Sequence, residues 1–243
     1  MTKPLLLLFA CVFLVSLAAS QALQKDTIHT SAGDVEITFV GHATVMLRWG
    51  GKTIDVDPWT RLPGFAGLPE ADLVLVTHDH ADHCDTAAIA AVRTPATVIL
   101  LTEKCAARVR GGIVMKNGDV KKVFGVTIEA VPAYNLEHKR PDGVPFHPKG
   151  EGNGYVLTIG HTRIYFAGDT ENTPEMEALK NIDIAFLPMN LPYTMTPEMV
   201  AAAAKAFRPK ILYPYHYSQT DPQKLVELMK DVKGVEVRVR NMR

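Results

Sequence analysis

Three histidines and two aspartates lie within six consecutive positions of this chain, residues 78–83. His78, Asp79, His80, Asp82 and His83 follow a short apolar run and precede an alanine-rich segment, so we place them on a loop between a strand and a helix. Zinc and similar divalent metals bind imidazole nitrogen and carboxylate oxygen, and an extended loop sends His78 and His80 to the same side. The alternative is a solvated polar turn. The whole chain has 9 histidines, however, and three of them so close together favour a metal site.

A metal site needs further ligands, and two candidates follow other expected strands. Asp169 comes directly after the apolar residues 163–167, and His216 comes after residues 210–213. Ligands from different strands of an α/β sheet converge outside the carboxyl ends of those strands. Alone, Asp169 is typical of a turn and His216 of a buried core, but together with the first cluster both are predicted ligands.

The elements that must position these side chains alternate between strands and helices. Apolar runs predict strands at residues 35–40, 43–48, 52–56, 72–77, 97–101, 126–131, 155–159, 163–167, 182–187, 210–213 and 235–239. Helical periodicity and capping residues predict helices at residues 86–92, 103–110, 174–180, 197–207 and 222–232. A long irregular stretch, residues 133–154, interrupts this pattern, and loops of that length inside a compact domain are usually functional.

The order of these elements predicts one α/β domain made of two similar halves. Each half passes from β-hairpins into βα units, and the centre lies near residues 111–117. Asn117-Gly118 is the strongest short hairpin signal in the chain. No repeat, low-complexity tract or linker marks a boundary, so residues 23–243 are expected to form a single domain.

The first 22 residues are expected to be a cleaved signal peptide. Lys3 gives a positive start, Leu5–Ala19 is nearly unbroken apolar sequence, and small residues allow cleavage after Ser20 or Ala22. An uncleaved anchor fits less well, because the apolar run is shorter than the roughly 20 residues that span a bilayer. A lipoprotein site at Cys11 fits less well too, because the apolar run continues past it. The expected location is therefore secreted or periplasmic, without a stable membrane anchor.

Charge and cysteine content narrow the choice of partners. The 243 residues include 26 Lys+Arg and 26 Asp+Glu, and this balance argues against nucleic acid or an anionic membrane as the main partner. The mature chain keeps Cys84 and Cys105, which in an oxidising compartment either pair or stay free. Since 47% of the residues are hydrophobic, the core is expected to supply most of the stability.

The order of these motifs resembles that of a known superfamily. His-x-His-x-Asp-His after a strand, then Gly-Asp-Thr at 168–170 and a late strand-end histidine, is similar to the metallo-β-lactamase superfamily of metal-dependent hydrolases. Residues 40–43 (Val-Gly-His-Ala) and 55–58 (Asp-Val-Asp-Pro) extend the likeness, which covers residues 34–243. Within the superfamily the chain more closely resembles the branch with ascorbate-6-phosphate lactonase-like and N-acyl-phosphatidylethanolamine phospholipase D-like proteins. The resemblance implies an αββα sandwich of two mixed sheets. It also implies one or two metal ions, usually zinc, with manganese and iron as alternatives.

The resemblance also implies a ligand set, with one departure. Carried across by motif, the first metal would bind His78 and His80, the second Asp82, His83 and His216, and Asp169 would bridge them. The family places one more histidine soon after the strand that ends here at Val131, where this chain has Asn135. Three outcomes remain open: His147 folds back as a substitute, Asn135 or water completes the shell, or only one metal binds well.

Residues around the expected ligands have supporting roles. Ligating histidines usually donate their other N–H to a carboxylate or carbonyl, and Asp57, after a strand and before a proline, is placed to accept it. A simple turn aspartate is the alternative. His42 also follows a strand and is expected to lie in this second layer, lining the pocket, whereas His138 is expected on the solvated surface. Residues expected to contact substrate are Tyr134, Lys149 and Tyr193.

These features predict an exported metal-dependent hydrolase that acts on a small molecule. The metal would lower the pKa of a water molecule to roughly 7, and Asp82 would orient the resulting hydroxide or accept its proton. The expected target is a small ester, lactone or phosphodiester bond. The alternatives are a non-catalytic metal- or ligand-binding protein on the same fold, and a β-lactamase.

Overall fold

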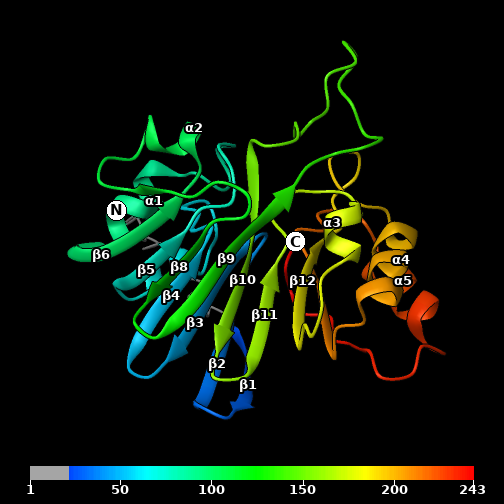
Figure 1. The fold of residues 1–243 in the computed structure, drawn as a ribbon, viewed down its shortest axis with the longest axis horizontal. Coiled ribbons are helices and arrows are strands. Elements are labelled where there is room, and N and C mark those ends of the chain that lie inside the picture. Colours follow the sequence, from blue (N-terminus) through cyan, green and yellow to red (C-terminus); the bar gives the residue numbers. More distant parts are fainter. Residues whose placement is uncertain (1–21) are drawn as a thin grey trace, which may run out of the picture.

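The structure, a computed structural model, describes residues 22–243 and consists of two facing seven-stranded sheets (Figure 1). The first sheet contains, in spatial order, β1 (Gln24–Thr30), β2 (Gly33–Gly41), β3 (Thr44–Trp49), β4 (Lys52–Val56), β5 (Ala71–Leu75), β6 (Arg93–Leu101) and β7 (Ile113–Val114). Strands β1 to β4 are antiparallel, and β4 to β7 are parallel. This change to parallel pairing puts the ends of several strands at one edge.

The second sheet has the same plan in mirror order. It contains β14 (Glu236–Val237), β13 (Ile211–Tyr215), β12 (Ile184–Pro188), β11 (Thr162–Phe166), β10 (Gly152–Ile159), β9 (Val126–Ala133) and β8 (Val120–Val123). Strands β8 to β11 are antiparallel, and β11 to β14 are parallel. The carboxyl ends of β11 and β13 therefore lie at a common edge, as the ligand convergence rule requires.

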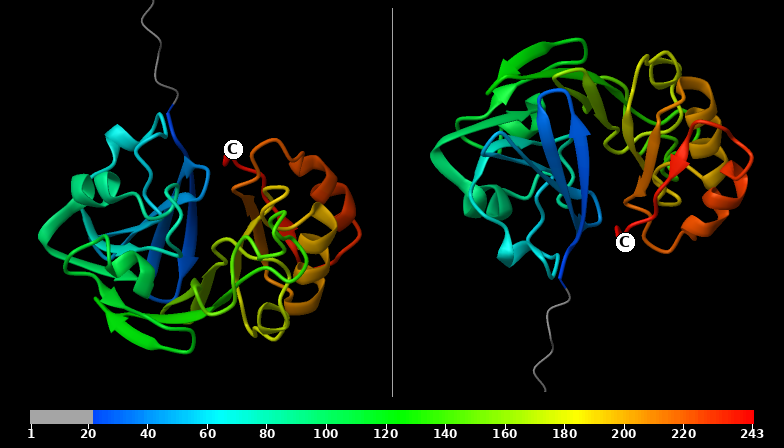
Figure 2. Two further views of the ribbon diagram at one scale, coloured as in Figure 1. Left: turned by 90° about the horizontal axis from the view of Figure 1, so that it is seen from above. Right: turned by 90° about the horizontal axis from the view of Figure 1, so that it is seen from below.

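Helices lie on the outer sides of the two sheets (Figure 2). On the first sheet these are α1 (Thr86–Val92) and α2 (Glu103–Ala106), and on the second α3 (Pro174–Glu177), α4 (Pro197–Phe207) and α5 (Pro222–Met229). A short 3-10 helix spans Phe65–Gly67. Asp85 caps α1 by accepting from two backbone N–H groups, and Thr196 caps α4, where Pro197 takes the first helical position. The expected αββα sandwich is confirmed.

The main core fills the space between the sheets. Phe39 of β2 contacts Phe186 of β12 and Tyr213 of β13, with ring centroids 6.2 Å and 5.0 Å apart. All three rings are buried, and they belong to one apolar cluster that draws on both sheets. Because apolar burial is the main stabilising term, the two sheets support each other and hold the loops at their common edge in place.

The structure differs from the sequence predictions in several elements. Strands β1, β7 and β8 were not predicted, because their short or polar sequences lack an alternating pattern, yet β1 pairs with β2 along its whole length. The turn at Asn117-Gly118 links β7 to β8, whereas the hairpin of β8 and β9 turns at Phe124-Gly125, with φ of 51° and 90°. Helices α2 and α3 are four residues long, shorter than predicted.

Two expectations concern the chain outside this framework. Residues 1–21, which hold most of the expected signal peptide, lie outside the described residues. Within residues 22–243, no helix combines the length and apolarity that a membrane span needs. Cys84 and Cys105 are both buried and free, so of the two open outcomes the structure has the unpaired one.

One buried carboxylate of the first sheet lacks any partner. Asp55 of β4 is 0% exposed, and its register neighbours Met46 and Val74 are buried and apolar. Neither carboxylate oxygen has a hydrogen-bond partner among residues 22–243. Burial raises the pKa of Asp55 to about 7, because a charge in apolar surroundings loses its hydration.

We expect Asp55→Asn to change how stability depends on pH. The folded-state pKa of Asp55 lies above the ordinary value of 3.8. The stability that the neutral carboxyl group contributes is therefore fully present below pH 3.8 and is lost as the pH rises to about 7. Above that pH the buried charge costs up to about 4 kcal/mol, which the asparagine variant avoids. Urea unfolding of both proteins from pH 4 to pH 8 measures this. Parallel pH profiles for the two proteins would contradict it.

Candidate metal centre

The loops that follow β5, β11 and β13 meet at one edge of the sandwich, together with the segment between β9 and β10. This segment, residues 134–151, is called the strap below. It leaves the end of β9 and rises above the edge of the second sheet before it returns to β10 (Figure 1). The strap corresponds to the long irregular stretch of the sequence.

The first group of possible ligands contains His78, His80, His147 and Asp169. The loop after β5 supplies two of these histidines, the strap supplies His147, and the loop after β11 supplies the aspartate. One ligand atom from each residue lies within 4.8 Å of those of the others. The structure therefore places His147 where the third imidazole of this group is needed.

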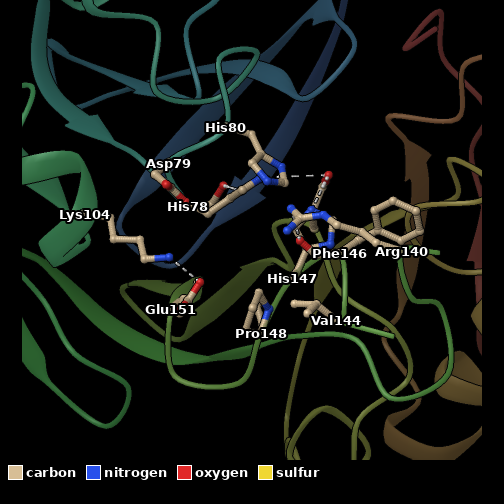
Figure 3. A pocket seen from close by; sticks show the side chains of 14 residues that line it. His78, Asp79, His80, Lys104, Arg140, Val144, Phe146, His147, Pro148 and Glu151 are labelled. Atoms are coloured by element: carbon tan, nitrogen blue, oxygen red, sulfur yellow. Dashed lines mark hydrogen bonds and ion pairs between the residues drawn. The ribbon is translucent and has the colours of Figure 1, made fainter. Parts of the chain in front are cut away.

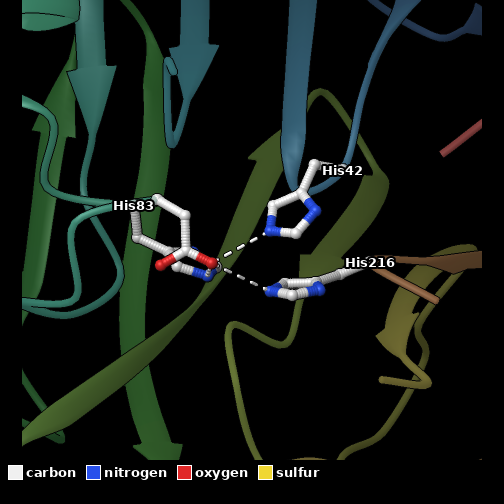
Figure 4. A group of neighbouring side chains, drawn as sticks. His42, His83 and His216 are labelled. Atoms are coloured by element: carbon white, nitrogen blue, oxygen red, sulfur yellow. Dashed lines mark hydrogen bonds and ion pairs between the residues drawn. The ribbon is translucent and has the colours of Figure 1, made fainter. Parts of the chain in front are cut away.

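The second group contains His42, Asp82, His83 and His216, again with ligand atoms within 4.8 Å of one another (Figure 4). The Asp82 Oδ2 atom lies 2.9 Å from His42 Nε2 and 3.6 Å from His216 Nε2. The sequence analysis expected His42 only in the layer behind the ligands. In the structure its ring lies among them, with its centroid 3.7 Å from that of the His216 ring and the two ring planes tilted by 40°.

Asp169 lies between the two groups. Its Oδ2 atom is 3.4 Å from Nε2 of both His147 and His216, and its Oδ1 atom is 3.6 Å from Nε2 of His83. The carboxylate thus contacts histidines of both groups from a position that is only 5% exposed. This is the geometry that a bridging carboxylate requires.

Asp57 holds His83 from behind. Its Oδ2 atom accepts from His83 Nδ1 at 2.7 Å, and both of its oxygens accept from Thr77, at 2.8 Å from the backbone N–H and 2.6 Å from the hydroxyl. Asp57 and His83 are both 0% exposed. Since Nδ1 donates to a carboxylate, the other ring nitrogen of His83 faces the site and becomes a lone-pair donor when a metal displaces its proton.

Asn135 holds His147 in the same way. The Asn135 Oδ1 atom accepts from the Nδ1 atom of His147 at 2.6 Å and from its backbone N–H at 2.8 Å. The Asn135 amide donates to Glu171 Oε1 and to the backbone oxygen of Tyr193, both at 2.9 Å. With its oxygen turned to His147, Asn135 is not placed as a ligand. It orients His147, which belongs to the first group of possible ligands.

Glu171 fixes the start of the strap and was not predicted. Its buried carboxylate accepts from the backbone N–H groups of Leu136, Glu137 and His138 at 2.6–2.8 Å, besides the Asn135 amide. His138 Nδ1 also lies 2.8 Å from Glu171, so this histidine belongs to the anchor and not to the open surface. The sequence signal was the position of Glu171, two residues after Asp169.

Charges within the site reinforce one another. Burial lowers the pKa of His78 well below its usual value, and the neighbouring His83 adds to this effect. Burial acts in the same direction on His83, but the carboxylates of Asp169 and Asp57 outweigh it and raise its pKa well above the usual value. Burial raises the pKa of Asp169, but His216 and His83 outweigh it and hold that pKa well below its usual range. Asp169 is therefore ionised at neutral pH.

The donor atoms fit a divalent metal. The Nε2 atoms of His78, His83, His147 and His216 are buried without a hydrogen-bond partner among the described residues, and so is Asp169 Oδ1. Buried polar atoms are rarely left unpaired, because each lost hydrogen bond with water costs free energy. Imidazole nitrogens around a shared carboxylate are the ligand chemistry of zinc and of related first-row metals.

Two cavities open onto these donors. One has a volume of about 390 Å³ and is lined by His78, His80 and His147 (Figure 3). The other, about 510 Å³, reaches Asp82 and His216. Volumes of this size suit small-molecule ligands.

The residues expected to contact substrate divide between two places. Tyr193 is 45% exposed and lines the second cavity. Tyr134 and Lys149 line neither cavity, because both are held by Glu175: the Tyr134 hydroxyl donates to it at 2.8 Å and the Lys149 ammonium at 2.7 Å. The substrate role expected for these two residues stays a prediction.

We expect Asp57→Asn to weaken metal binding at the second group. The substitution keeps the size of the side chain, and asparagine tolerates the φ of 45° at this position. It removes the charge that orients His83, and changes of this kind typically cost about 10–100-fold in metal affinity. Zinc titration against a chromophoric chelator measures the loss. Asp72→Asn, at a carboxylate that pairs with Lys52 on the same sheet, is the control. Equal zinc affinity in the two variants would rule the effect out.

Comparison with known proteins gives consistent results. A family model described as a beta-lactamase superfamily domain matches residues 36–216. A UPF0173 metal-dependent hydrolase from Thermococcus onnurineus is 35% identical over 214 residues, which is 81% of this chain and 93% of the relative. A crystal structure of a proposed metal-dependent hydrolase from Parabacteroides distasonis has a TM-score of 0.86 and 44% identity, covering 91% of this chain and 100% of the other. Igni18, a metallo hydrolase from Ignicoccus hospitalis, shares the fold, with a TM-score of 0.70, 24% identity, and coverage of 86% and 96%.

Two sheets packed face to face, with two adjacent groups of histidine and aspartate at one edge, define a metal-dependent hydrolase of the metallo-β-lactamase type. The relatives specify the group further. The chain belongs to the metallo-β-lactamase superfamily and, within it, to the UPF0173 family of metal-dependent hydrolases.

Proposed function

We propose that this enzyme hydrolyses a small ester, lactone or phosphodiester, with zinc at both groups of donors. The observation that carries the proposal is the pair of four-residue groups with Asp169 between them, at the floor of two cavities of small-molecule size. A lone metal group would also suit a structural site. Two groups that share a carboxylate beneath open cavities are better suited to catalysis, since a catalytic site must keep a position for substrate.

Bound divalent metal would supply Lewis acidity and an activated water molecule. The chain's own residues contribute positioning and proton transfer. Of the two carboxylates in these groups, Asp82 is the more exposed, with 32% of its side chain accessible against 4% for Asp169. His42 and His216 both contact Oδ2 of Asp82. Its Oδ1 atom can therefore orient the attacking water or take its proton.

Two finer points belong to the same proposal. The likeness to the ascorbate-6-phosphate lactonase-like and phospholipase D-like branch favours a lactone or phosphodiester over a β-lactam. The apolar sequence before residue 22 favours a secreted or periplasmic enzyme whose signal peptide, residues 1–22, is removed, with residues 23–243 as the one hydrolase domain. The balanced charge favours a small-molecule substrate over nucleic acid.

Metal removal and a substrate panel test the function. We expect the purified protein to hold two zinc ions per chain and to cleave at least one of three chromogenic substrates: an aryl ester, a lactone and a phosphodiester. Dialysis against a chelator should abolish turnover, because the histidines and aspartates alone do not activate the water molecule. Added zinc should restore turnover. A protein that holds two metals and cleaves none of the three, nor a chromogenic β-lactam, would instead be a metal- or ligand-binding protein. Cleavage of the β-lactam alone would identify a β-lactamase.

A further inference from the structure

Arg140 of the strap lies in a wall that the two cavities share. Both cavities are lined by Arg140 and Phe146, and both also reach His80, His147 and Asp169. A molecule that approaches the donors through either cavity therefore passes the same guanidinium and the same aromatic ring.

The charge of Arg140 is not used by the protein itself. Its guanidinium donates to the backbone oxygen of Phe146 at 3.3 Å, and no carboxylate of residues 22–243 lies within ion-pair distance of it. Lys104, at the far end of the first cavity, is different, because it is paired with Glu151 at 2.6 Å. A guanidinium recognises carboxylate and phosphate oxygens through two parallel hydrogen bonds, and here that capacity is free.

Apart from Asp169 of the donor groups, the acidic residues that line the first cavity lie at the end away from Arg140. Figure 3 shows Asp79 and Glu151 on the side of Lys104, whereas Phe146 and Val144 lie on the side of Arg140. The hydrogen bond to Glu151 is the main cause that raises the pKa of Lys104, and the nearby charge of Asp79 adds to this effect. The carboxylates that line the second cavity, Asp82 and Asp169, belong to the two donor groups. Their negative charge would be offset by bound metal.

Apolar surface adjoins the guanidinium. The Phe146 ring packs edge-on against Tyr193, with centroids 5.0 Å apart. Val144 and Tyr193 are 42% and 45% exposed, more than large apolar side chains usually are. An unpaired cation beside exposed aromatic and aliphatic groups matches a ligand that carries both a negative charge and an apolar part.

We propose that the substrate is a small organic anion with an apolar group, whose carboxylate or phosphate oxygens pair with Arg140. Its apolar part lies against Phe146 and Tyr193, and its scissile bond lies over the donor groups. The inference rests on the proposed hydrolase function and narrows its substrate class. In the reaction, water supplies OH to the acyl or phosphoryl centre and a proton to the leaving oxygen, so no other reactant is needed.

Matched esters test the charge preference. The monoester of 4-nitrophenol with adipic acid and 4-nitrophenyl hexanoate have the same chain length and leaving group, and differ in a terminal carboxylate or methyl. We expect the ratio of their kcat/KM values, anionic over neutral, to fall about tenfold in Arg140→Gln, because a charge-assisted pair is lost. Arg140→Lys should show a smaller fall, since it keeps the charge without the fork. Lys139→Gln, which removes the neighbouring exposed charge of the strap, should leave the ratio unchanged.

A phosphodiester separates the two sources of the anion. If Arg140→Gln also lowers kcat/KM for bis(4-nitrophenyl) phosphate relative to the hexanoate, Arg140 pairs with a charge at the reacting centre. If the adipate ratio alone falls, the charge is remote from that centre. An unchanged ratio for both anionic substrates in Arg140→Gln, with zinc content equal to wild type, would overturn the inference.

Binding measurements keep the inference testable if no ester is turned over. In that case the proposed function fails on its own, and titration calorimetry with phenylphosphonate compares the proteins directly. The inference expects about tenfold weaker binding in Arg140→Gln than in Lys139→Gln. Equal affinities of the two variants would overturn it.

Discussion

Replacing Asp169 by asparagine is expected to remove metal from both groups of donors and to lower kcat/KM by about a thousandfold or more. Asp169 is the residue whose oxygens approach histidines of both groups, within 3.4–3.6 Å of His147, His216 and His83. Asparagine keeps the shape but removes the charge, so the first group loses its carboxylate and the second group loses the shared charge and keeps only that of Asp82.

Zinc content by mass spectrometry and turnover of the best substrate check this prediction together. Asp34→Asn is a suitable control, because Asp34 is exposed in the β1–β2 hairpin and contacts only His29. Two zinc ions per chain in Asp169→Asn would show that the carboxylate does not bridge. Full zinc loss with undiminished turnover would contradict the metal mechanism itself.

Glu171→Gln is expected to release the third imidazole of the first group. Glu171 accepts four hydrogen bonds, all from N–H donors, two at each oxygen. A glutamine can accept at one oxygen only, and its own N–H₂ group would face two of those donors. The loss of hydrogen bonds to a buried charge costs about 2–4 kcal/mol, and Asn135 would no longer be held against His147.

The measurable result is a protein with one tightly bound zinc ion per chain and about 100-fold weaker binding of the second. The free energy of unfolding should fall, and limited proteolysis should cut the strap faster than in wild type. Glu175→Gln is the matched control, because Glu175 lies in the same region but holds Tyr134 and Lys149 instead. If Glu171→Gln lowers stability and still binds two zinc ions with wild-type affinity, Glu171 supports the fold without positioning His147.

The sequence predicted the framework well because its signals are local. Helices α1 and α4 begin and end at the predicted residues, since Asp85 and Thr196 cap them through hydrogen bonds only two or three residues away. The cluster at 78–83 was equally visible, because all of its members lie on one short loop. Strand β1 was missed because its conformation comes from pairing with β2 and not from its own pattern.

The ligand question at Asn135 could not be decided from sequence. Twelve positions separate Asn135 from His147, and their approach depends on the folding of the whole strap, including the backbone bond from Asn135 N–H to His147 oxygen at 2.8 Å. The anchor for that fold, Glu171, lies on a third segment. The hydrogen bonds of Tyr134 and Lys149 to Glu175 could not be predicted for the same reason, because Glu175 is distant in sequence and adjacent in space.

Arg140 also gave no sequence signal, since a single arginine in a polar loop has no distinguishing pattern. Two structural facts single out Arg140: it lines both cavities, and no carboxylate among residues 22–243 lies within ion-pair distance of it. Asp57 was easier, because a carboxylate directly after a strand that precedes the histidine cluster is a physically motivated candidate. Residues that act through short-range geometry are therefore predictable, and those that act through tertiary contacts are not.

The strap has a consequence for how such enzymes diversify. In many enzymes the loops that choose the substrate can be exchanged while the catalytic groups stay on the rigid scaffold. Here one segment, residues 134–151, carries both His147 and Arg140. Grafting this loop from a relative would replace a candidate metal ligand along with the residue proposed to select the substrate, and its Asn135 would need a residue equivalent to Glu171 in the recipient scaffold. Selectivity and catalytic competence are therefore inherited together, and loop exchange in this enzyme should succeed only when scaffold and strap are transferred as a pair.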